Sequence, residues 1–263
     1  MLEVLGIEER LLNMAAITIE NVQIQHGEYK LKGRVYRAKG NEPKPSVLIC
    51  HGYPGDTKNM DLAEELAFNG INVLVFYYMG AWGSEGTYRF KNLTPSTKSA
   101  LDWFIEKPYV DPERVALISH SMGAVPLTNL MSKDSRVKTG VLMSPASDIS
   151  KWLGEGVIDN IFQGFTSMSV GKLAMEDLDE YKADMIEAGT TLNPMDKVDS
   201  IKAPLMFVVG SKDDVTTPDL CEKLYERAKS EKEWVLIDGA DHSYTEHRIP
   251  LQKAILDWLG RKL

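Results

Sequence analysis

The stretch Val115–Ala124, which reads VALISHSMGA, constrains the fold of this chain more than any other feature. Its first four residues form a short apolar run, the pattern of a strand buried on both faces of a parallel sheet. Small residues follow, and a helical pattern resumes over Ala124–Met131. A strand that turns this sharply into a helix holds the residue at the apex in a strained conformation, with its side chain facing an open crevice. Here that residue is Ser121, which makes it a candidate nucleophile.

Ser121 has a second, simpler interpretation. A serine that precedes a helix can accept a hydrogen bond from a backbone N–H of the first turn and so cap the helix. Both interpretations fit the local sequence. The decision between them rests on what the other strand ends carry.

Strand and helix patterns alternate along most of the chain. Two alternating segments, Ile17–Gln25 and Tyr29–Tyr36, flank a short turn and predict an antiparallel hairpin. Thr94 and Pro95 predict the start of a helix, with the threonine as its cap. Because helices separate the later strands, we expect a mostly parallel, doubly wound sheet covered on both faces. The later strands are predicted at Ser46–Cys50, Ile71–Tyr77, Val115–Ile118, Gly140–Met143, Ala203–Gly210 and Glu233–Ile237, and the helices at Leu2–Ala15, Lys58–Phe68, Thr94–Ile105, Ala124–Met131, Pro218–Lys229 and Pro250–Leu259.

One segment, residues 148–198, departs from this alternation. It is rich in apolar, aromatic and glycine residues but carries no strand pattern. A segment this long is not a bare connection inside a compact domain. We interpret it as a small helical cap inserted over the crevice of a single domain that spans residues 1–263. A packing layer with no role at the site is the alternative.

Two later strand ends carry the partners that a serine nucleophile needs. A serine hydroxyl is a poor nucleophile at neutral pH, so it requires a base to take its proton and a third group to orient that base. In a doubly wound sheet these groups come from the carboxyl ends of other strands, where the crevice opens. An acidic turn with Asp213 and Asp214 follows one predicted strand, and His242 follows the next in a loop of small residues.

The chain order serine, aspartate, histidine resembles that of the α/β-hydrolase superfamily. Its nucleophile motif, G-x-S-x-G, matches here with Ser119 in place of the first glycine. The resemblance spans about residues 17–263 and implies an α/β-hydrolase fold. It also implies that Ser121 is the nucleophile, that His242 is the general base and then the acid, and that an aspartate orients the histidine.

The resemblance also selects between the adjacent acidic residues. Family loops commonly read G-x-x-D-x-V, a pattern that Gly210, Asp213 and Val215 match, so Asp213 is preferred to Asp214 as the third member of the triad. His51 and His120 flank the implied site, but they occupy positions that the family uses for packing or loop shape.

Two backbone N–H groups are implied as donors to the oxyanion that forms during acyl transfer. Met122 follows the nucleophile, and Tyr53 lies in an H-G-x loop after the strand Ser46–Cys50. The glycine-rich loop 80–86 is similar to a loop of prolyl-oligopeptidase-like and cinnamoyl-esterase-like hydrolases, with Met79 in place of their arginine. No role of that arginine therefore carries over. The loop lacks the lysine of a phosphate-binding P-loop.

Composition excludes several classes of function. Thirty basic and 38 acidic residues give a net charge of −8, which argues against a general role in binding nucleic acid or an anionic membrane. The first residues lack the pattern of a secretory signal, and the chain has no run of 18 apolar residues. Cys50 and Cys221 fit small buried hydrophobes rather than a disulfide or metal site. These features predict a cytoplasmic protein without metal or membrane.

We therefore predict a serine hydrolase that cleaves carboxylic esters through an acyl-enzyme intermediate, with a small-molecule ester as substrate and no cofactor. A peptidase or amidase, and a thioesterase or acyltransferase, would use the same triad. A non-catalytic binding protein on the same fold is the alternative from a different class. The sequence identifies no substrate-binding residues, and it is compatible with a homo-oligomer without predicting one.

Overall fold

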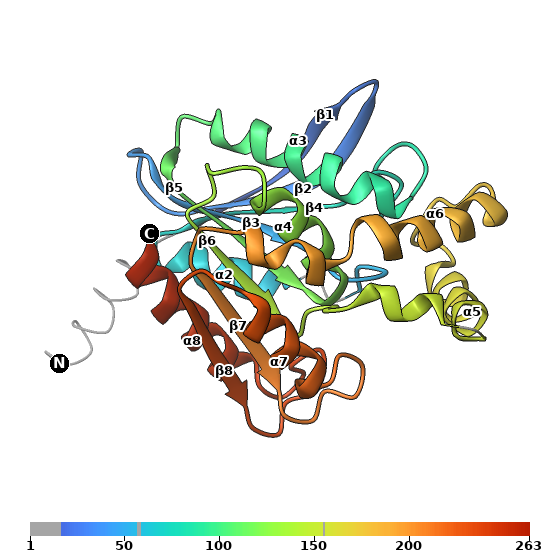
Figure 1. Cartoon of the computed structure of the whole chain (residues 1–263). Coiled ribbons are helices and arrows are strands. Elements are labelled where there is room, and N and C mark those ends of the chain that lie inside the picture. The colour runs from blue at the N-terminus through green and yellow to red at the C-terminus, as the bar shows by residue number, and fades with distance from the viewer. Residues whose placement is uncertain (1–16, 57–58, 155) are drawn as a thin grey trace, which may run out of the picture.

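The computed structural model describes residues 17–56, 59–154 and 156–263. Its centre is an eight-stranded sheet with the strand order β1-β2-β4-β3-β5-β6-β7-β8 (Figure 1). The pairs β1–β2 and β2–β4 are antiparallel, and all pairs from β4–β3 to β7–β8 are parallel. The strands are β1 (Thr18–His26), β2 (Tyr29–Arg37), β3 (Lys44–Cys50), β4 (Asn72–Phe76), β5 (Val110–His120), β6 (Thr139–Met143), β7 (Leu205–Gly210) and β8 (Lys232–Ile237).

Helices cover both faces of this sheet. Alternate residues of each central strand point to opposite faces. In β3, Leu48 belongs to the cluster that α3, α4 and α7 cover, and Ile49 belongs to the cluster that α2 and α8 cover. The predicted mostly parallel, doubly wound sheet with an antiparallel N-terminal hairpin is therefore confirmed. The helices are α2 (Met60–Phe68), α3 (Leu93–Ile105), α4 (Ala124–Met131), α7 (Pro218–Arg227) and α8 (Arg248–Lys262).

Some predicted boundaries need correction. A short 3₁₀ helix, η1 (Phe90–Asn92), leads directly into α3, so α3 begins at Leu93 and Thr94 is not its cap. Within the described residues the buried Thr94 hydroxyl has no hydrogen-bond partner. The predicted helix Leu2–Ala15 lies outside the described residues.

The segment between β6 and β7 contains η3 (Ile149–Leu153), α5 (Val157–Ser169), α6 (Leu178–Thr191), η4 (Pro194–Asp196) and η5 (Val198–Ser200). Figure 1 shows α5 and α6 at the right of the view, extending outward from the rest of the domain. The Asp184 carboxylate holds α6 against the domain by accepting hydrogen bonds from the backbone N–H groups of Phe90 (2.5 Å) and Lys91 (3.2 Å). Backbone bonds also join the glycine-rich loop to the strand-like residues after α5, including Trp82 N to Lys172 O at 2.8 Å. The described helices include none that is long and apolar enough to cross a membrane.

Candidate active site

Ser121 lies at a sharp turn between β5 and α4. Its φ of 53° is in the left-handed region, which a serine adopts only where the surroundings impose it. A short 3₁₀ turn, η2 (Ser121–Gly123), leads into α4. A Cβ atom on Gly123 would lie 2.1 Å from the carbonyl oxygen of Cys50, so only glycine lets the helix start this close to β3.

The capping interpretation of Ser121 does not hold. The N-cap residue of α4 is Gly123 and that of η2 is His120, and neither helix start has a side-chain cap. Ser119, which replaces the first glycine of the motif, is buried and donates a hydrogen bond to the Val141 carbonyl at 3.3 Å. A serine therefore fits this position without displacing the turn.

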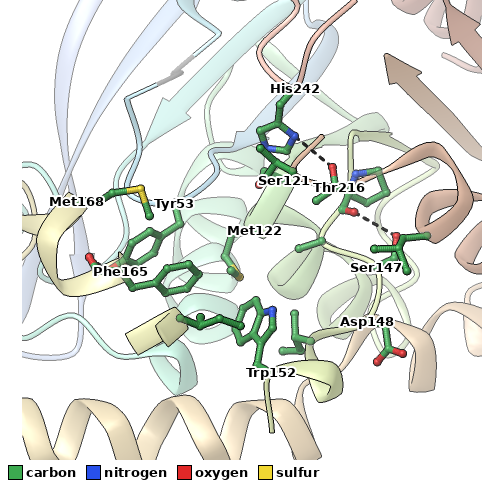
Figure 2. A pocket seen from close by; sticks show the side chains of 16 residues that line it. Tyr53, Ser121, Met122, Ser147, Asp148, Trp152, Phe165, Met168, Thr216 and His242 are labelled. Carbon is green, nitrogen blue, oxygen red and sulfur yellow. Dashed lines mark hydrogen bonds between the residues drawn. The ribbon is translucent and has the colours of Figure 1, made fainter. Parts of the chain in front are cut away.

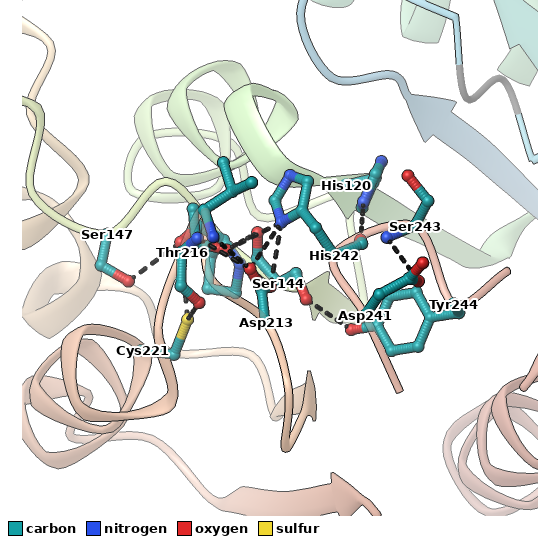
Figure 3. Close-up of polar contacts among 12 residues, drawn as sticks. His120, Ser144, Ser147, Asp213, Thr216, Cys221, Asp241, His242, Ser243 and Tyr244 are labelled. Atoms are coloured by element: carbon teal, nitrogen blue, oxygen red, sulfur yellow. Dashed lines mark hydrogen bonds and ion pairs between the residues drawn. The ribbon is translucent and has the colours of Figure 1, made fainter. Parts of the chain in front are cut away.

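Asp213 and His242 lie together beside this turn, although 29 positions separate them (Figure 3). His242 Nδ1 is 2.9 Å from Asp213 Oδ2 and 3.1 Å from Oδ1. The Asp213 side chain is completely buried, whereas Asp214 is exposed and makes no comparable contact with the histidine in the described chain. With a proton on Nδ1 facing the carboxylate, the histidine presents Nε2 as a proton acceptor.

Asp213 is kept ionised by its hydrogen bonds. Burial alone would raise the pKa of the carboxyl, but hydrogen bonds from His242 and other neighbours outweigh burial and hold its pKa below the ordinary value. The backbone N–H groups of Val215 (2.9 Å) and Thr216 (2.8 Å) also donate to Oδ1. Asp213 can therefore stabilise a positive charge on His242.

Thr216 and Ser144 complete this polar cluster, and neither residue was predicted from the sequence. The Thr216 hydroxyl is 3.0 Å from Asp213 Oδ2, 3.1 Å from His242 Nδ1 and 3.0 Å from the Ser144 carbonyl oxygen. Ser144 has a φ of 42°, and its hydroxyl contacts Tyr244, which donates to the Val208 carbonyl. The only signal in the sequence was the D-x-x-T spacing, since an aspartate often binds the N–H of a residue two or three positions later.

The ring of His120 contacts the backbone of the loop that carries His242. Its Nε2 lies 2.8 Å from the carbonyl oxygen of His242, and the two rings are 5.0 Å apart. Burial, with a smaller effect from His242, lowers the pKa of His120 to about 4, so its ring is neutral at pH 7. A neutral ring with its proton on Nε2 donates to this carbonyl. The family resemblance implied a role for His120 in packing or loop shape, and its contact is with the loop that carries His242.

A cavity of about 430 Å³ opens over Ser121 (Figure 2). Ser121 and His242 line one part of it, and Trp152 and Phe165 line the part beneath α5. Trp152, which belongs to the segment 148–198, therefore forms part of the cavity wall. Trp82 is absent from the described lining and donates from Nε1 to the Pro54 carbonyl. The remaining apolar lining consists of Met122, Pro145, Ala146, Ile149, Ile161, Met168, Val215 and Leu220.

Tyr53 and Met122 also line the cavity beside Ser121. Met122 is in the first turn of a helical segment, where backbone N–H groups have no partner within the helix. The loop that carries Tyr53 passes close to the nucleophile, because a Cβ on Gly52 would lie 3.0 Å from Ser121 Cβ. No group of three or more His, Cys, Asp or Glu side chains in the described residues could hold a metal ion.

The chain is similar in sequence to several known proteins. Residues 77–263 match the model of the prolyl oligopeptidase family. An uncharacterized protein of Mycobacterium tuberculosis is 26% identical over 226 residues, which cover 86% of this chain and 72% of that protein. Acylamino-acid-releasing enzyme 2 of Oryza sativa is 24% identical over 186 residues, which cover 66% of this chain and 24% of that enzyme.

Solved structures share the fold. Est1E from Butyrivibrio proteoclasticus, solved with ferulic acid bound, superposes with a TM-score of 0.75 at 18% identity, covering 92% of this chain and 98% of that one. The Pyrococcus furiosus esterase PF2001 gives a TM-score of 0.71 at 23% identity, covering 94% and 91%. These likenesses show the α/β-hydrolase fold, and the family match covers most of the chain. The chain belongs to the prolyl oligopeptidase family, within the α/β-hydrolase superfamily of serine hydrolases.

Proposed function

We propose that this protein hydrolyses carboxylic esters through a covalent acyl-enzyme formed on Ser121. One observation carries the proposal. Ser121 sits on a left-handed turn in the same cavity as His242, whose Nδ1 is bound by a fully buried aspartate. A base oriented in this way is what a serine hydroxyl needs to become a nucleophile.

The proposed reaction has two halves. His242 Nε2 takes the proton of Ser121 as its Oγ attacks the ester carbonyl, and the tetrahedral intermediate collapses when the same proton passes to the leaving alcohol. A water molecule then gives a proton to His242 and attacks the acyl-enzyme. The acid leaves as the proton returns to Ser121 Oγ.

Two further groups have roles in this proposal. The backbone N–H groups of Tyr53 and Met122 would stabilise the negative oxygen in both tetrahedral intermediates. Asp213 would orient the imidazole and stabilise it when it is protonated. Residues 148–198, which we propose act as a cap, contribute Trp152 and Phe165 to an apolar cavity wall, and this supports an apolar acyl group in that part of the site.

The test is hydrolysis of short p-nitrophenyl esters by the wild-type protein and by Ser121→Ala. We expect the substitution to lower kcat by about 10⁴-fold or more, because the covalent step loses its nucleophile. A fluorophosphonate probe should label the wild type and not the variant. Ester hydrolysis that survives in Ser121→Ala would exclude this serine as the nucleophile.

Failure of the wild type to label would favour the alternative of a binding protein that shares the fold. Only an activated serine reacts quickly with a fluorophosphonate. The labelling experiment therefore separates an enzyme from a non-catalytic protein even where the natural ester is not among the substrates tried.

Amide hydrolysis is the second candidate, because the family is that of prolyl oligopeptidase and one relative is named as an acylamino-acid-releasing enzyme. Comparing kcat/KM for an N-acyl aminoacyl p-nitroanilide with that for a p-nitrophenyl ester of the same acyl group decides between the two. A higher value for the anilide would replace the esterase proposal. Thioester substrates and alcohol acceptors can be compared in the same assay.

A further inference from the structure

The side chain of Tyr53 extends from the loop after β3 to the helices α5 and α6. Its phenol hydroxyl donates to the Phe165 carbonyl oxygen at 3.0 Å and accepts a hydrogen bond from the Tyr181 hydroxyl at 2.9 Å. The Ser169 hydroxyl contacts both the phenol and the same carbonyl oxygen. Ser169 and Tyr181 are fully buried, so water does not replace these bonds readily.

The ring of Tyr53 packs on α5 as well. It stacks on the ring of Phe165 with centroids 4.2 Å apart and planes 19° apart (Figure 2). Phe165 and Met168 of the same helix line the cavity over Ser121. The Tyr53 side chain thus packs on the cavity wall, while the neighbouring residue Gly52 lies close to Ser121.

Weaker ties join the same two regions. Lys172, just after α5, pairs with Asp56 at 2.6 Å on the surface, where an ion pair contributes little. Trp82 bonds the Pro54 carbonyl through its side chain and the Lys172 carbonyl through its backbone. Of these ties, those of Tyr53 reach two fully buried side chains, Ser169 and Tyr181, whereas the ion pair of Lys172 and Asp56 is exposed.

We propose that Tyr53 is a positioning residue whose phenol ties the oxyanion loop to α5 and α6 and so keeps its own backbone N–H aimed at the oxyanion. This inference rests on the proposed hydrolase function. Gly52 and Gly55 of this loop have no side chain that could reach α5 or α6, whereas Tyr53 reaches both helices. A donor that is held in place costs no reorganisation when charge develops on the substrate.

Tyr53→Phe removes the hydroxyl and keeps the ring stack. Loss of an oxyanion donor typically lowers turnover about 10²–10³-fold, and a loosened donor should lose part of that, so we expect kcat for p-nitrophenyl butyrate to fall about 10-fold with KM within about 2-fold. A purely structural role would change the melting temperature and leave kcat of the folded protein intact. Unchanged kcat in Tyr53→Phe overturns the inference.

Ser169→Ala and Thr166→Ala form a matched pair on α5. Both residues donate a hydroxyl to the backbone carbonyl four positions earlier, but only Ser169 also contacts Tyr53. Ser169→Ala should lower kcat in the same direction as Tyr53→Phe and combine with it non-additively. Thr166→Ala should leave kcat at the wild-type value. Equal losses in the two alanine variants would contradict a specific tie.

Hydrogen–deuterium exchange tests the tie without any substrate. Amides of residues 51–56 and 165–170 should exchange faster in Tyr53→Phe and Ser169→Ala, and at the wild-type rate in Thr166→Ala. If Ser121→Ala hydrolyses esters as well as the wild type, the proposed function fails, and with it the positioning role. If only Ser121 proves essential while loop exchange in Tyr53→Phe is unchanged, the hydrolase stands and the tie fails.

Discussion

Asp213 and Asp214 are adjacent and carry the same charge, yet the fold gives them opposite surroundings. Asp213 is buried and bound by His242 and two backbone N–H groups, and Asp214 is exposed. Burying a carboxylate is unfavourable unless hydrogen bonds compensate it. A buried, ionised carboxylate of this kind lowers the stability of the fold unless it is compensated, and such groups are typical of catalytic clusters.

Asp213→Asn should therefore inactivate the protein while leaving it folded. The amide can donate to His242 Nδ1, which favours the wrong tautomer of the imidazole, and such a change costs about 10⁴-fold in kcat in a serine protease. We expect a loss of this order for p-nitrophenyl esters, with circular dichroism unchanged.

Asp214→Asn is the matched control, because it makes the same change one residue away. It should keep kcat within about 2-fold of the wild type, as surface substitutions seldom matter. If Asp214→Asn lost activity and Asp213→Asn kept it, the two aspartates would exchange roles.

Among the contacts between elements, the packing of the start of α4 against β3 fixes the position of Ser121. The missing Cβ of Gly123 allows this contact, since the nearest atom to that position is the Cys50 carbonyl oxygen at 2.1 Å. This oxygen is a backbone atom of β3, so it cannot avoid the added Cβ by a change of rotamer. Gly123→Ala should therefore push α4 from β3, lower kcat about 10²-fold or more, and cost about 1–3 kcal/mol of stability.

Gly164→Ala in α5 is the control for Gly123→Ala. A Cβ at Gly164 would meet no heavy atom within 4 Å, and alanine favours a helix over glycine by about 0.5–1 kcal/mol. This variant should be at least as stable as the wild type. Urea denaturation followed by circular dichroism measures the stability of both variants. Equal stability of the two would show that a Cβ at position 123 does not clash with β3.

Across the whole molecule, the sequence predicted what depends on local pattern. Apolar runs such as Val115–Ile118 indicated buried strands, and the residues after them indicated Ser121, Asp213 and His242. The fold prediction is confirmed. The structure brings Ser121 and His242 to the lining of one cavity and places Asp213 against His242, and the catalytic roles of the three residues are proposals.

What the sequence could not predict depends on contacts between distant segments. The bond from His120 to the His242 carbonyl joins residues 122 positions apart, and that from Tyr53 to Phe165 joins residues 112 apart. No local pattern encodes such pairs. The cap predicted at Thr94 was wrong because η1 leads directly into α3, whose N-cap residue is Asn92 and has no side-chain cap.

The buried ring of His120 makes the stability of the whole chain depend on pH in the acid range. Burial lowers the pKa of its ring from 6.5 to about 4 in the folded protein, whereas the unfolded chain binds the proton near pH 6.5. Between these values the unfolded state holds more protons, so the free energy of unfolding falls as the pH falls. Above pH 6.5 the ring is neutral in both states and His120 no longer makes stability depend on pH. Between pH 7 and pH 5 its titration lowers the free energy of unfolding by about 2 kcal/mol.

Urea denaturation of wild type and His120→Asn at pH 7 and pH 5 measures this contribution. Asparagine does not titrate, so the variant should show a pH 7 to pH 5 difference smaller by about 2 kcal/mol. Ser119→Ala, which removes a buried hydroxyl one residue away, should be destabilised equally at both pH values. If His120→Asn loses as much stability on acidification as the wild type, the acid sensitivity arises from another group, and His120 is protonated with no greater difficulty in the folded chain than in the unfolded one.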